Sequence, residues 1–489
     1  MSERPLTPVR LAGGCLVLSL LCWAVVALAG PSAAVPPLGG GAGSFDLGLR
    51  PSSGLVTALL AVSVLSGGGA LLAGWRAVAR GWHPRRFVLV ALVGAVLFTL
   101  LPPVGSADHL SYAAYGRIAA LGGDPYSQPP DTFAGGHDPV TSAVRDPWRS
   151  TTSVYGPVGA LLMALASLGG GDSVRTTVSC WQVLLLLAWL ASALALRVAV
   201  RDPQRRARAQ LLWTANPLLL TVGLSGAHAD VLAGTAALAT LLAARRHPFW
   251  AGVALAVAVG TKLPYGAVAL GVLLAARAGG YLTRGWLLRG AAGALLLLVP
   301  AHVWAGPHAY DQTRTASRYV SLATVWRPLV EAGMPRGWLL PGTVLVMAAV
   351  AFAWWRLLVR GDALTRAAGV STVLAAGYLL GTAYELPWYD LLLWGPLALA
   401  LAAPSSAGVR RGVLTGVLTG RLTLLALAYV PGLVDGMSPS VEALTLGYRK
   451  EVGPWISWSA LVVVLVVGLL LRRRIGRGDT VGHWVEGSP

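Results

Sequence analysis

Charge is scarce in this chain of 489 residues. Asp, Glu, Lys and Arg make up only 12% of it, whereas soluble globular domains contain about 25% charged residues. Hydrophobic residues make up 55% of the chain, and its mean hydropathy is +0.65. This balance excludes an ordinary water-soluble enzyme and indicates a membrane protein.

Cysteine and lysine are also rare. Cys15 and Cys22 fall in one apolar run and Cys180 in another, so the sequence indicates no disulfide framework. Lys262 and Lys450 are the only lysines. Because arginine fills almost every other cationic position, a lysine inside an apolar stretch, as Lys262 is, stands out.

Basic residues nevertheless exceed acidic ones, and the formal net charge is +18. They occur in short clusters between apolar runs, which is typical of the cytoplasmic loops that orient membrane helices. The sequence has no basic stripe with interleaved aromatic residues and no nucleic-acid motif, so DNA and RNA are excluded as partners.

Long apolar runs dominate what is present. A bilayer core of about 30 Å requires about 20 apolar residues per helix, so we expect an all-α polytopic bundle of about fourteen transmembrane helices. The expected spans are 11–30, 54–77, 87–104, 177–200, 208–224, 228–244, 248–260, 263–277, 285–304, 338–358, 365–384, 387–403, 411–430 and 455–471. Residues 27–29 resemble a signal-peptide cleavage site, but the long apolar core favours a retained helix.

The basic clusters predict an orientation with the N-terminus in the cytoplasm. All clusters then face the cytoplasm, provided that the apolar stretch 155–169 is re-entrant or interfacial and does not cross the membrane. We expect one integral-membrane domain, 1–489, in the plasma (inner) membrane, with its chemistry built from outer loops and outer helix ends. The expected outer loops are 105–153, 305–337 and 432–454, and the expected cytoplasmic tail is 472–489.

The first candidate functional residue is Asp108, at the start of a predicted helix in the first outer loop. Tyr112 and Tyr115 follow at helical spacing and share its face, with an apolar stripe opposite. This pattern predicts an amphipathic interfacial helix that presents a carboxylate flanked by two phenols at the outer surface. The alternative is that Asp108 only caps the helix.

Two more candidate segments lie at outer helix ends. The turn 224–230 contains His228 and Asp230, and ionisable residues at membrane depth are functional by default, although they could belong to a helix cap. No spacing typical of metal ligands accompanies them. Lys262, beside Pro264 at a predicted helix start, could bind a phosphate or simply snorkel to the interface.

The fourth segment, 384–389, combines aromatic residues with Glu385. Trp388 and Tyr389 could be membrane-interface anchors, but a sugar stacked on an aromatic ring beside a carboxylate would use all three. Further phosphate or acceptor candidates in the second long outer loop are Arg314, Arg318 and Arg327.

Taken together, the chain resembles the GT-C glycosyltransferases. It is most similar to the polyprenyl-phosphomannose-dependent alpha-1,6-mannopyranosyltransferases that build the mannan core of actinobacterial lipomannan and lipoarabinomannan. The resemblance runs from about residue 87 to 430, with its motifs in order on the expected outer face. These motifs are Asp108 with Ser111–Arg117, Gly123–Tyr126, Tyr155–Pro157, Asn216–Pro217, Gly226–Asp230, Lys262–Pro264 and Glu385–Tyr389.

The resemblance implies roles for these residues. Asp108 would be the catalytic base; many family members have two adjacent acids here, whereas this chain has one, which puts a metal role in doubt. No metal or other cofactor is expected. The donor phosphate would be held by Lys262, Arg314 and Arg318. The sugars and the acceptor would contact His109, Tyr112, Tyr115, Asp124, Tyr126, Tyr155, His228, Asp230, Glu385, Trp388 and Tyr389.

The implied reaction transfers mannose from polyprenyl-phosphate-mannose to the 6-hydroxyl of a mannan or phosphatidylinositol-mannoside-type lipid acceptor, with inversion, on the extracytoplasmic face. One alternative is an arabinosyl or other hexosyl transferase of the same fold. A second is a lipid-linked-sugar flippase or transporter, which would place ionisable residues near mid-membrane and show repeat symmetry. A third is a non-catalytic scaffold in envelope assembly.

Overall fold

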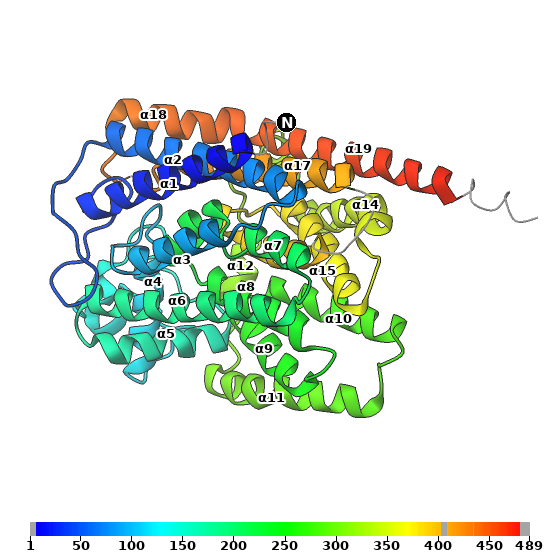
Figure 1. Ribbon diagram of the computed structural model, residues 1–489. Helices are drawn as coiled ribbons and strands as arrows, with labels where there is room; N and C mark the ends of the chain where they lie inside the picture. The colour runs from blue at the N-terminus through cyan, green and yellow to red at the C-terminus, as the bar shows by residue number, and fades with distance from the viewer. Residues whose placement is uncertain (1–5, 402–407, 434, 480–489) are drawn as a thin grey trace, which may run out of the picture.

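The computed structural model describes residues 6–401, 408–433 and 435–479, and within these ranges it contains helices and no β-strand (Figure 1). Among the described residues, seven helices are long and apolar enough to cross a membrane, or eight if one bent pair counts as a span. The protein is therefore an all-helical multi-pass bundle. The expected number of about fourteen spans is not confirmed.

The candidate spans begin at polar capping residues in several cases. Ser52, Ser173, Thr283 and Asp362 each accept a hydrogen bond from a backbone N–H three residues further on, which satisfies one of the free amides of the first helical turn. The spans lie in α1 (Leu6–Ala29), α2 (Ser53–Ala79), α6 (Val174–Ala199), α11 (Arg284–Ala305), α14 (Leu339–Leu358), α15 (Ala363–Gly381) and the run from α18 (Pro439–Gly447) through η7 (Tyr448–Val452) to α19 (Gly453–Asp479).

The remaining α-helices lie between these spans along the chain. They are α3 (Arg85–Thr99), α4 (Asp108–Ala120), α5 (Pro157–Gly170), α7 (Pro203–Leu212), α8 (Asp230–Ala243), α9 (Pro248–Thr261), α10 (Ala267–Ala278), α12 (Asp311–Ala316), α13 (Trp326–Glu331), α16 (Leu391–Ala400) and α17 (Gly408–Ala428). Short 3-10 or π-helical segments are η1 (Phe133–Gly136), η2 (Thr141–Ala143), η3 (Leu219–Ser225), η4 (Leu263–Gly266), η5 (Arg336–Trp338) and η6 (Pro387–Asp390).

The expected span 208–224 is wrong, because the helix breaks in its middle. α7 ends at Leu212, and the π-helical η3 begins only at Leu219. Pro217 has no N–H to continue a helix and disfavours helical geometry in the residue before it. The Asn216 side chain occupies the break, donating to the Leu212 carbonyl at 3.1 Å and accepting from the Leu218 N–H at 3.1 Å. η3 then meets α8 at 114°.

Other expected boundaries also change. α9 has 14 residues and α10 has 12, so each is shorter than a bilayer core requires. The expected span 387–403 is η6 followed by α16, whose ten residues are all buried inside the protein. The expected outer loop 432–454 is helical from Pro439 onward. Part of the expected tail, residues 480–489, lies outside the described residues.

α4 forms where the sequence predicts a helix, but it is not an amphipathic surface helix. Its apolar residues Leu110 and Ile118 and its tyrosines Tyr112 and Tyr115 are all buried. α4 packs so closely on α5 that a Cβ atom on Gly116 would lie 2.3 Å from the Met163 carbonyl oxygen. The predicted polar face is therefore an internal contact surface, not one exposed to water.

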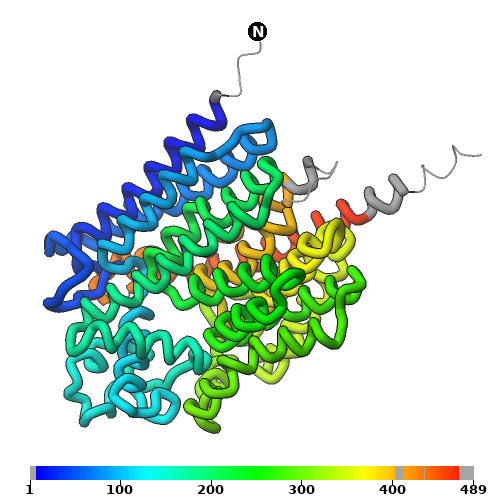
Figure 2. The backbone as a smooth tube through the Cα atoms, turned by 60° about the horizontal axis from the view of Figure 1, so that its bottom comes forward, coloured from blue at the N-terminus to red at the C-terminus, as the bar shows by residue number. Residues whose placement is uncertain are grey.

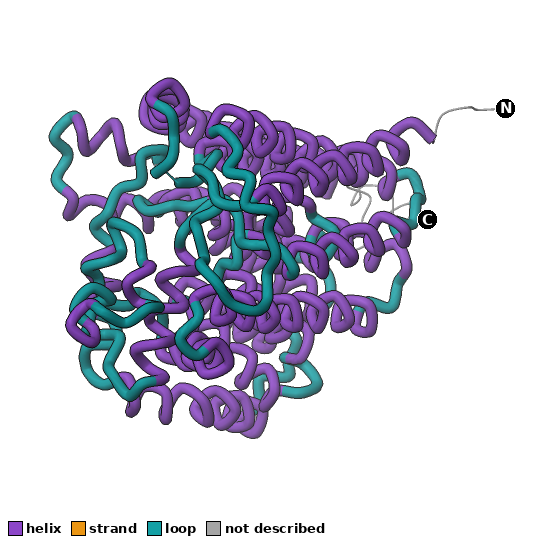
Figure 3. Tube along the Cα trace, turned by 90° about the vertical axis from the view of Figure 1, so that its left-hand side faces the viewer, coloured by secondary structure: helices purple, strands orange, loops and turns teal. Residues whose placement is uncertain are grey.

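The two ends of the bundle differ. In Figure 1 the turns between α10 and α11 and between α14 and α15 lie on the right, whereas the loop 30–52 lies on the left. Arg205, in the first turn of α7, pairs at 3.2 Å with Asp362 in the α14–α15 turn, so the basic start of α7 lies at the same end of the bundle as these turns. Figure 2 shows α1 and α2 side by side along one edge. Figure 3 looks at the opposite end, where loops are prominent.

Candidate active site

Asp108 is the first residue of α4, and its carboxylate is not used to cap the helix. The N-cap residue is Ala107, and no side chain caps this end. The Asp108 N–H donates to Ser106 Oγ at 3.3 Å. The positive end of the helix dipole favours an anion in the first turn, and the Asp108 side chain is 16% exposed. The capping interpretation is therefore wrong, and the carboxylate remains available.

The bend between η3 and α8 brings His228 to this carboxylate. Asp108 Oδ2 lies 3.5 Å from His228 Nδ1. Asp230, two residues further on, is the first residue of α8 and is buried. Ala229 is the N-cap of α8 and no side chain caps it, so neither ionisable residue has the capping role considered from sequence.

Lys262 lies between α9 and η4 and points into the protein. Its Nζ is 2.7 Å from Asp230 Oδ2, and the Tyr265 hydroxyl donates to the Asp230 carbonyl oxygen at 3.2 Å. The ammonium also lies 4.0 Å from the centre of the Tyr389 ring and 5.8 Å from that of Tyr155, which places it among π faces that attract a cation. The Lys262 side chain is only 14% exposed, so it does not snorkel to the interface.

Asp108, Asp230 and Lys262 line one cavity of about 1380 Å³, a volume that includes its open mouth. Its leucine-rich wall includes residues of α14 and α15. Its aromatic wall consists of Trp148, Tyr155, Tyr265, Tyr310, Tyr378, Tyr384 and Tyr389. Among the described residues that line the cavity, Lys262 is the only lysine or arginine. The cavity can thus hold a ligand that is polar at one end and apolar at the other.

Three predicted sugar-binding tyrosines stand behind this wall and not in it. Tyr112 packs edge-on against Tyr155, with ring centres 5.0 Å apart. Tyr126 donates from its hydroxyl to the Tyr155 carbonyl oxygen at 3.1 Å, and Tyr115 donates to the Thr151 carbonyl oxygen at 3.1 Å. The contacts of Tyr112 and Tyr126 hold Tyr155, which does line the cavity.

His109 and Asp124 also lie away from the cavity. His109 is buried, and burial, reinforced by His228, lowers its pKa to about 3, against the opposing effect of Asp108. His109 is therefore neutral at physiological pH and supplies no charge for an anion. The Asp124 carboxylate accepts a hydrogen bond from the Tyr126 N–H at 2.8 Å and so closes a turn.

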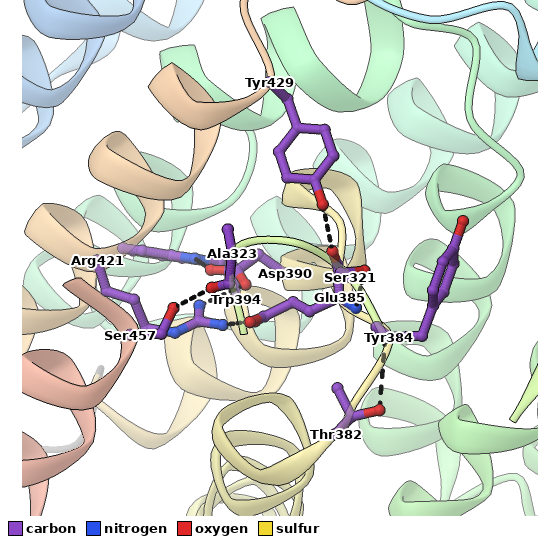
Figure 4. A network of polar contacts seen from close by, with 10 residues as sticks. All are labelled: Ser321, Ala323, Thr382, Tyr384, Glu385, Asp390, Trp394, Arg421, Tyr429 and Ser457. Carbon is purple, nitrogen blue, oxygen red and sulfur yellow. Dashed lines mark hydrogen bonds and ion pairs between the residues drawn. The ribbon is translucent and has the colours of Figure 1, made fainter. Parts of the chain in front are cut away.

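The segment 384–389 divides between two environments. The Trp388 ring stacks on His228, with centres 3.6 Å apart and planes inclined by 12°. Glu385 turns away from the main cavity and pairs with Arg421, whose guanidinium also meets Asp390 at 2.6 Å, as Figure 4 shows. The structure therefore does not bring Glu385 to the group around Lys262.

The predicted arginines of the second outer loop lie in or next to the short helices α12 and α13. Arg314 is 81% exposed and contacts Asp311 at 3.5 Å, while Arg318 is exposed. Other residues of α12 line the cavity, so these two arginines stand near its mouth. Arg327 pairs with Glu331 one helical turn away at 2.7 Å.

Three residues that the sequence reasoning did not single out are prominent here. Arg421 and Asp390 form a buried ionic cluster with Glu385, and Trp148 lines the cavity. Arg421 and Asp390 each lie inside an expected apolar span, and an ionisable residue in such a span is a signal that could have revealed them. Trp148 sits in a loop without a comparable signal.

The apolar helices and the enclosed acidic and basic groups define a multi-pass helical membrane protein with one polar-ended cavity. Residues 16–279 match the family described as "Alpha-(1->6)-mannopyranosyltransferase, N-terminal domain". The chain belongs to this family. The matched segment contains Asp108, His228, Asp230 and Lys262.

Several curated relatives carry the corresponding name. A probable alpha-(1->6)-mannopyranosyltransferase of Mycolicibacterium smegmatis is 31% identical over 148 residues, which are 29% of this chain and 25% of that protein. Alpha-(1->6)-mannopyranosyltransferase A of Corynebacterium glutamicum is 30% identical over 177 residues, 36% of this chain and 35% of that protein. The chain thus spans about a quarter to a third of the length of these relatives.

Among solved structures, the chain is similar to an oligosaccharyltransferase of Archaeoglobus fulgidus tethered to an acceptor peptide. The identity is 13%, the TM-score is 0.36, and the likeness covers 80% of this chain and 56% of the other. A TM-score this low marks a remote likeness.

Proposed function

We propose that the protein transfers mannose from polyprenyl-phosphate-mannose to the 6-hydroxyl of a mannoside acceptor, such as mannan or a phosphatidylinositol-mannoside-type lipid. One observation carries this proposal. The Asp108 carboxylate and the Lys262 ammonium line the same cavity, which has an aromatic wall and a leucine-rich wall. Membership of the family and the names of the curated relatives support the same sugar and linkage.

In the proposed reaction Asp108 is the general base. Its carboxylate takes the proton of the acceptor 6-hydroxyl while that oxygen attacks the anomeric carbon of the donor. The bond from the anomeric carbon to the phosphate oxygen breaks, and polyprenyl phosphate leaves with the electron pair. A single in-line displacement converts the β-linked donor into an α-linked product.

Lys262 contacts the donor phosphate in this scheme. A lysine ammonium has three N–H donors, and Asp230 engages Nζ on one side at 2.7 Å. The other donors can reach phosphate oxygens and stabilise the charge that develops as the phosphate departs. Arg314 and Arg318, near the mouth, add positive charge along the entry route. The scheme uses no nucleotide or metal, because the donor already carries its leaving group.

The acceptor and donor sugars lie against the aromatic wall. Tyr155 and Tyr389 flank Lys262 and therefore stand beside the proposed phosphate position. Trp148 and Tyr384 offer further ring faces to the same cavity. The leucines of α14 and α15 are suited to the apolar part of the lipid. In this arrangement the sugar end of the donor contacts the aromatic wall and its lipid end contacts the leucine-rich wall.

A transfer assay with the purified protein tests the proposal directly. It is incubated with polyprenyl-phosphate-mannose and a short alpha-mannoside, and the product linkage is analysed. An alpha-1,6-mannoside product is expected. Parallel reactions with polyprenyl-phosphate-arabinose and another hexosyl donor test the alternative sugar classes; transfer of arabinose in place of mannose would contradict the proposal.

Lys262→Ala is expected to weaken the binding of polyprenyl phosphate and of the donor, with little change for the acceptor. Loss of one charge-assisted contact costs roughly 1.5 to 3 kcal/mol, or about tenfold to over a hundredfold in affinity. Lys262→Arg should restore binding only in part, since a guanidinium has a different shape and stem. Titration with polyprenyl phosphate, and separately with an alpha-mannoside, measures both effects.

The control for this variant concerns Asp230. Removing the lysine leaves a buried carboxylate without its partner, which destabilises the fold. The double variant Asp230→Asn with Lys262→Met removes both charges, so it separates binding from folding. Unchanged affinity for polyprenyl phosphate in a folded double variant would show that Lys262 does not contact the phosphate.

We place the cavity on the extracytoplasmic side, because the basic turns gather at one end of the bundle. Single cysteines at Ser127 and at Arg201, both exposed, are introduced into a chain lacking its three native cysteines. An impermeant thiol reagent added outside intact cells should label position 127 and not position 201. The reverse pattern would invert the proposed orientation. Residues 225–229 are buried and unsuited to labelling.

A further inference from the structure

His228 lies next to Asp108 but is not part of the wall of the main cavity. Its ring is buried, and it is not among the residues that line the main cavity, whereas Asp108 is. The family resemblance implies that His228 binds sugar, but this placement gives a sugar in the cavity no direct access to it. Its contacts with the protein are therefore more informative than its distance from a substrate.

Both ring nitrogens of His228 face polar groups at the start of α4. Nδ1 lies 3.5 Å from Asp108 Oδ2 and 3.3 Å from the Tyr112 hydroxyl. Nε2 lies 3.3 Å from Ser106 Oγ, which in turn accepts the Asp108 N–H at 3.3 Å. The imidazole is thus linked to Asp108 in two ways. It contacts the Asp108 carboxylate directly, and it contacts Ser106, which binds the Asp108 N–H.

The imidazole is itself held firmly. Its face stacks on Trp388, with ring centres 3.6 Å apart. The turn that carries it is anchored by Trp181, whose Nε1 donates to the Ala227 carbonyl oxygen at 2.9 Å, and by Trp23, whose Nε1 donates to Ser225 Oγ at 2.9 Å. A carboxylate that acts as a base keeps one orientation only if the residue that binds it is itself rigid.

We propose that His228 is a positioning residue that orients the Asp108 carboxylate toward the acceptor hydroxyl. The proposal rests on the function proposed above for Asp108. This role requires the hydrogen on Nδ1, so that Nδ1–H is shared between Asp108 Oδ2 and the Tyr112 hydroxyl oxygen, while Nε2 accepts from the Ser106 hydroxyl. One carboxylate oxygen is then fixed, and the other is free to accept the proton of the acceptor.

Two substitutions separate orientation from packing. His228→Phe keeps an aromatic ring against Trp388 but removes both nitrogens. His228→Asn places an amide N–H near the position of Nδ1 and loses the ring. Positioning through Nδ1 predicts that the Phe variant loses about 100-fold in kcat, while the Asn variant stays within about tenfold of wild type. Michaelis constants for donor and acceptor should change little in either variant.

An infrared difference measurement gives a readout that does not depend on activity. The carboxylate stretch of Asp108 is isolated by subtracting the spectrum of Asp108→Asn. It should shift in His228→Phe and shift less in His228→Asn. Thermal unfolding of each variant confirms that the protein is folded before the spectra are compared.

The outcomes are distinct. An unshifted carboxylate band in folded His228→Phe overturns the positioning role, whatever the enzymatic rate. So does a raised Michaelis constant for the mannoside with unchanged kcat, which would make His228 a sugar contact. A wild-type protein that transfers no mannose, but whose Asp108 band shifts as expected, contradicts the proposed function and leaves the contact between His228 and Asp108 intact.

Discussion

Replacing Asp108 by Asn is expected to abolish mannosyl transfer while leaving the protein folded and able to bind the donor. The amide keeps the size of the carboxyl group but cannot accept a proton near neutral pH. Loss of a general base costs about 10²- to 10⁴-fold in rate. Because Asp108 makes no capping bond in α4, the helix loses little when the charge is removed. The initial rate of mannosyl transfer and the affinity for the donor are measured for the variant and for the wild-type protein.

Asp435→Asn is the matched control for this variant. The Asp435 side chain is 75% exposed and pairs only at 3.5 Å with Arg145, so the same chemical change there should leave the rate normal. A normal rate in Asp108→Asn would contradict its role as base. The remaining carboxylate on the cavity would then be Asp230, although it is already paired with Lys262.

Replacing Arg421 by Met is expected to cause the largest loss of stability. Its guanidinium pairs with both Glu385 and Asp390, and all three side chains are buried (Figure 4). Removing one member of a buried ionic group leaves uncompensated charge and costs about 3 to 5 kcal/mol in the free energy of unfolding. The measurement is unfolding of the purified protein in detergent by heat or denaturant.

Two further variants test the cause of this loss. Combining Arg421→Met with Glu385→Gln and Asp390→Asn removes the uncompensated charge, so the triple variant should recover much of the stability. Arg145→Met breaks a surface ion pair, which is worth at most about 1 kcal/mol. A single Arg421→Met variant as stable as Arg145→Met would show that the buried cluster contributes nothing to the fold.

Local patterns in the sequence identify the membrane class and the three charged residues of the cavity. Asp108, Asp230 and Lys262 are polar groups at helix ends in an apolar chain, and all three meet in the cavity. That outcome follows from the cost of leaving ionisable groups in lipid, which drives them toward one another. The sequence also contains Asn216 and Pro217, where the helix breaks. Because the spans are predicted from the length of apolar runs alone, this break falls inside the expected span 208–224.

Contacts between distant segments could not be predicted in the same way. Arg421 reaches Glu385 across 36 residues, and no periodicity relates the two positions. The hydrophobic stripe of α4 indicates a helix with an apolar side, but not that α5 covers it closely enough to exclude any side chain on Gly116. Burial on both faces depends on tertiary packing, which the pattern of one helix does not contain.

The site also draws on the part of the chain beyond residue 279, where the family match ends. Trp388 stacks on His228, and the Tyr389 ring lies 4.0 Å from Lys262 Nζ, so each of two polar residues from the matched segment is covered by an aromatic ring from η6. The matched segment is consequently not a separable module. Expressed alone, residues 16–279 would lack these two rings. A chimaera that joins this segment to the C-terminal part of a relative would have to preserve both the stacking contact on His228 and the cation–π contact of Lys262.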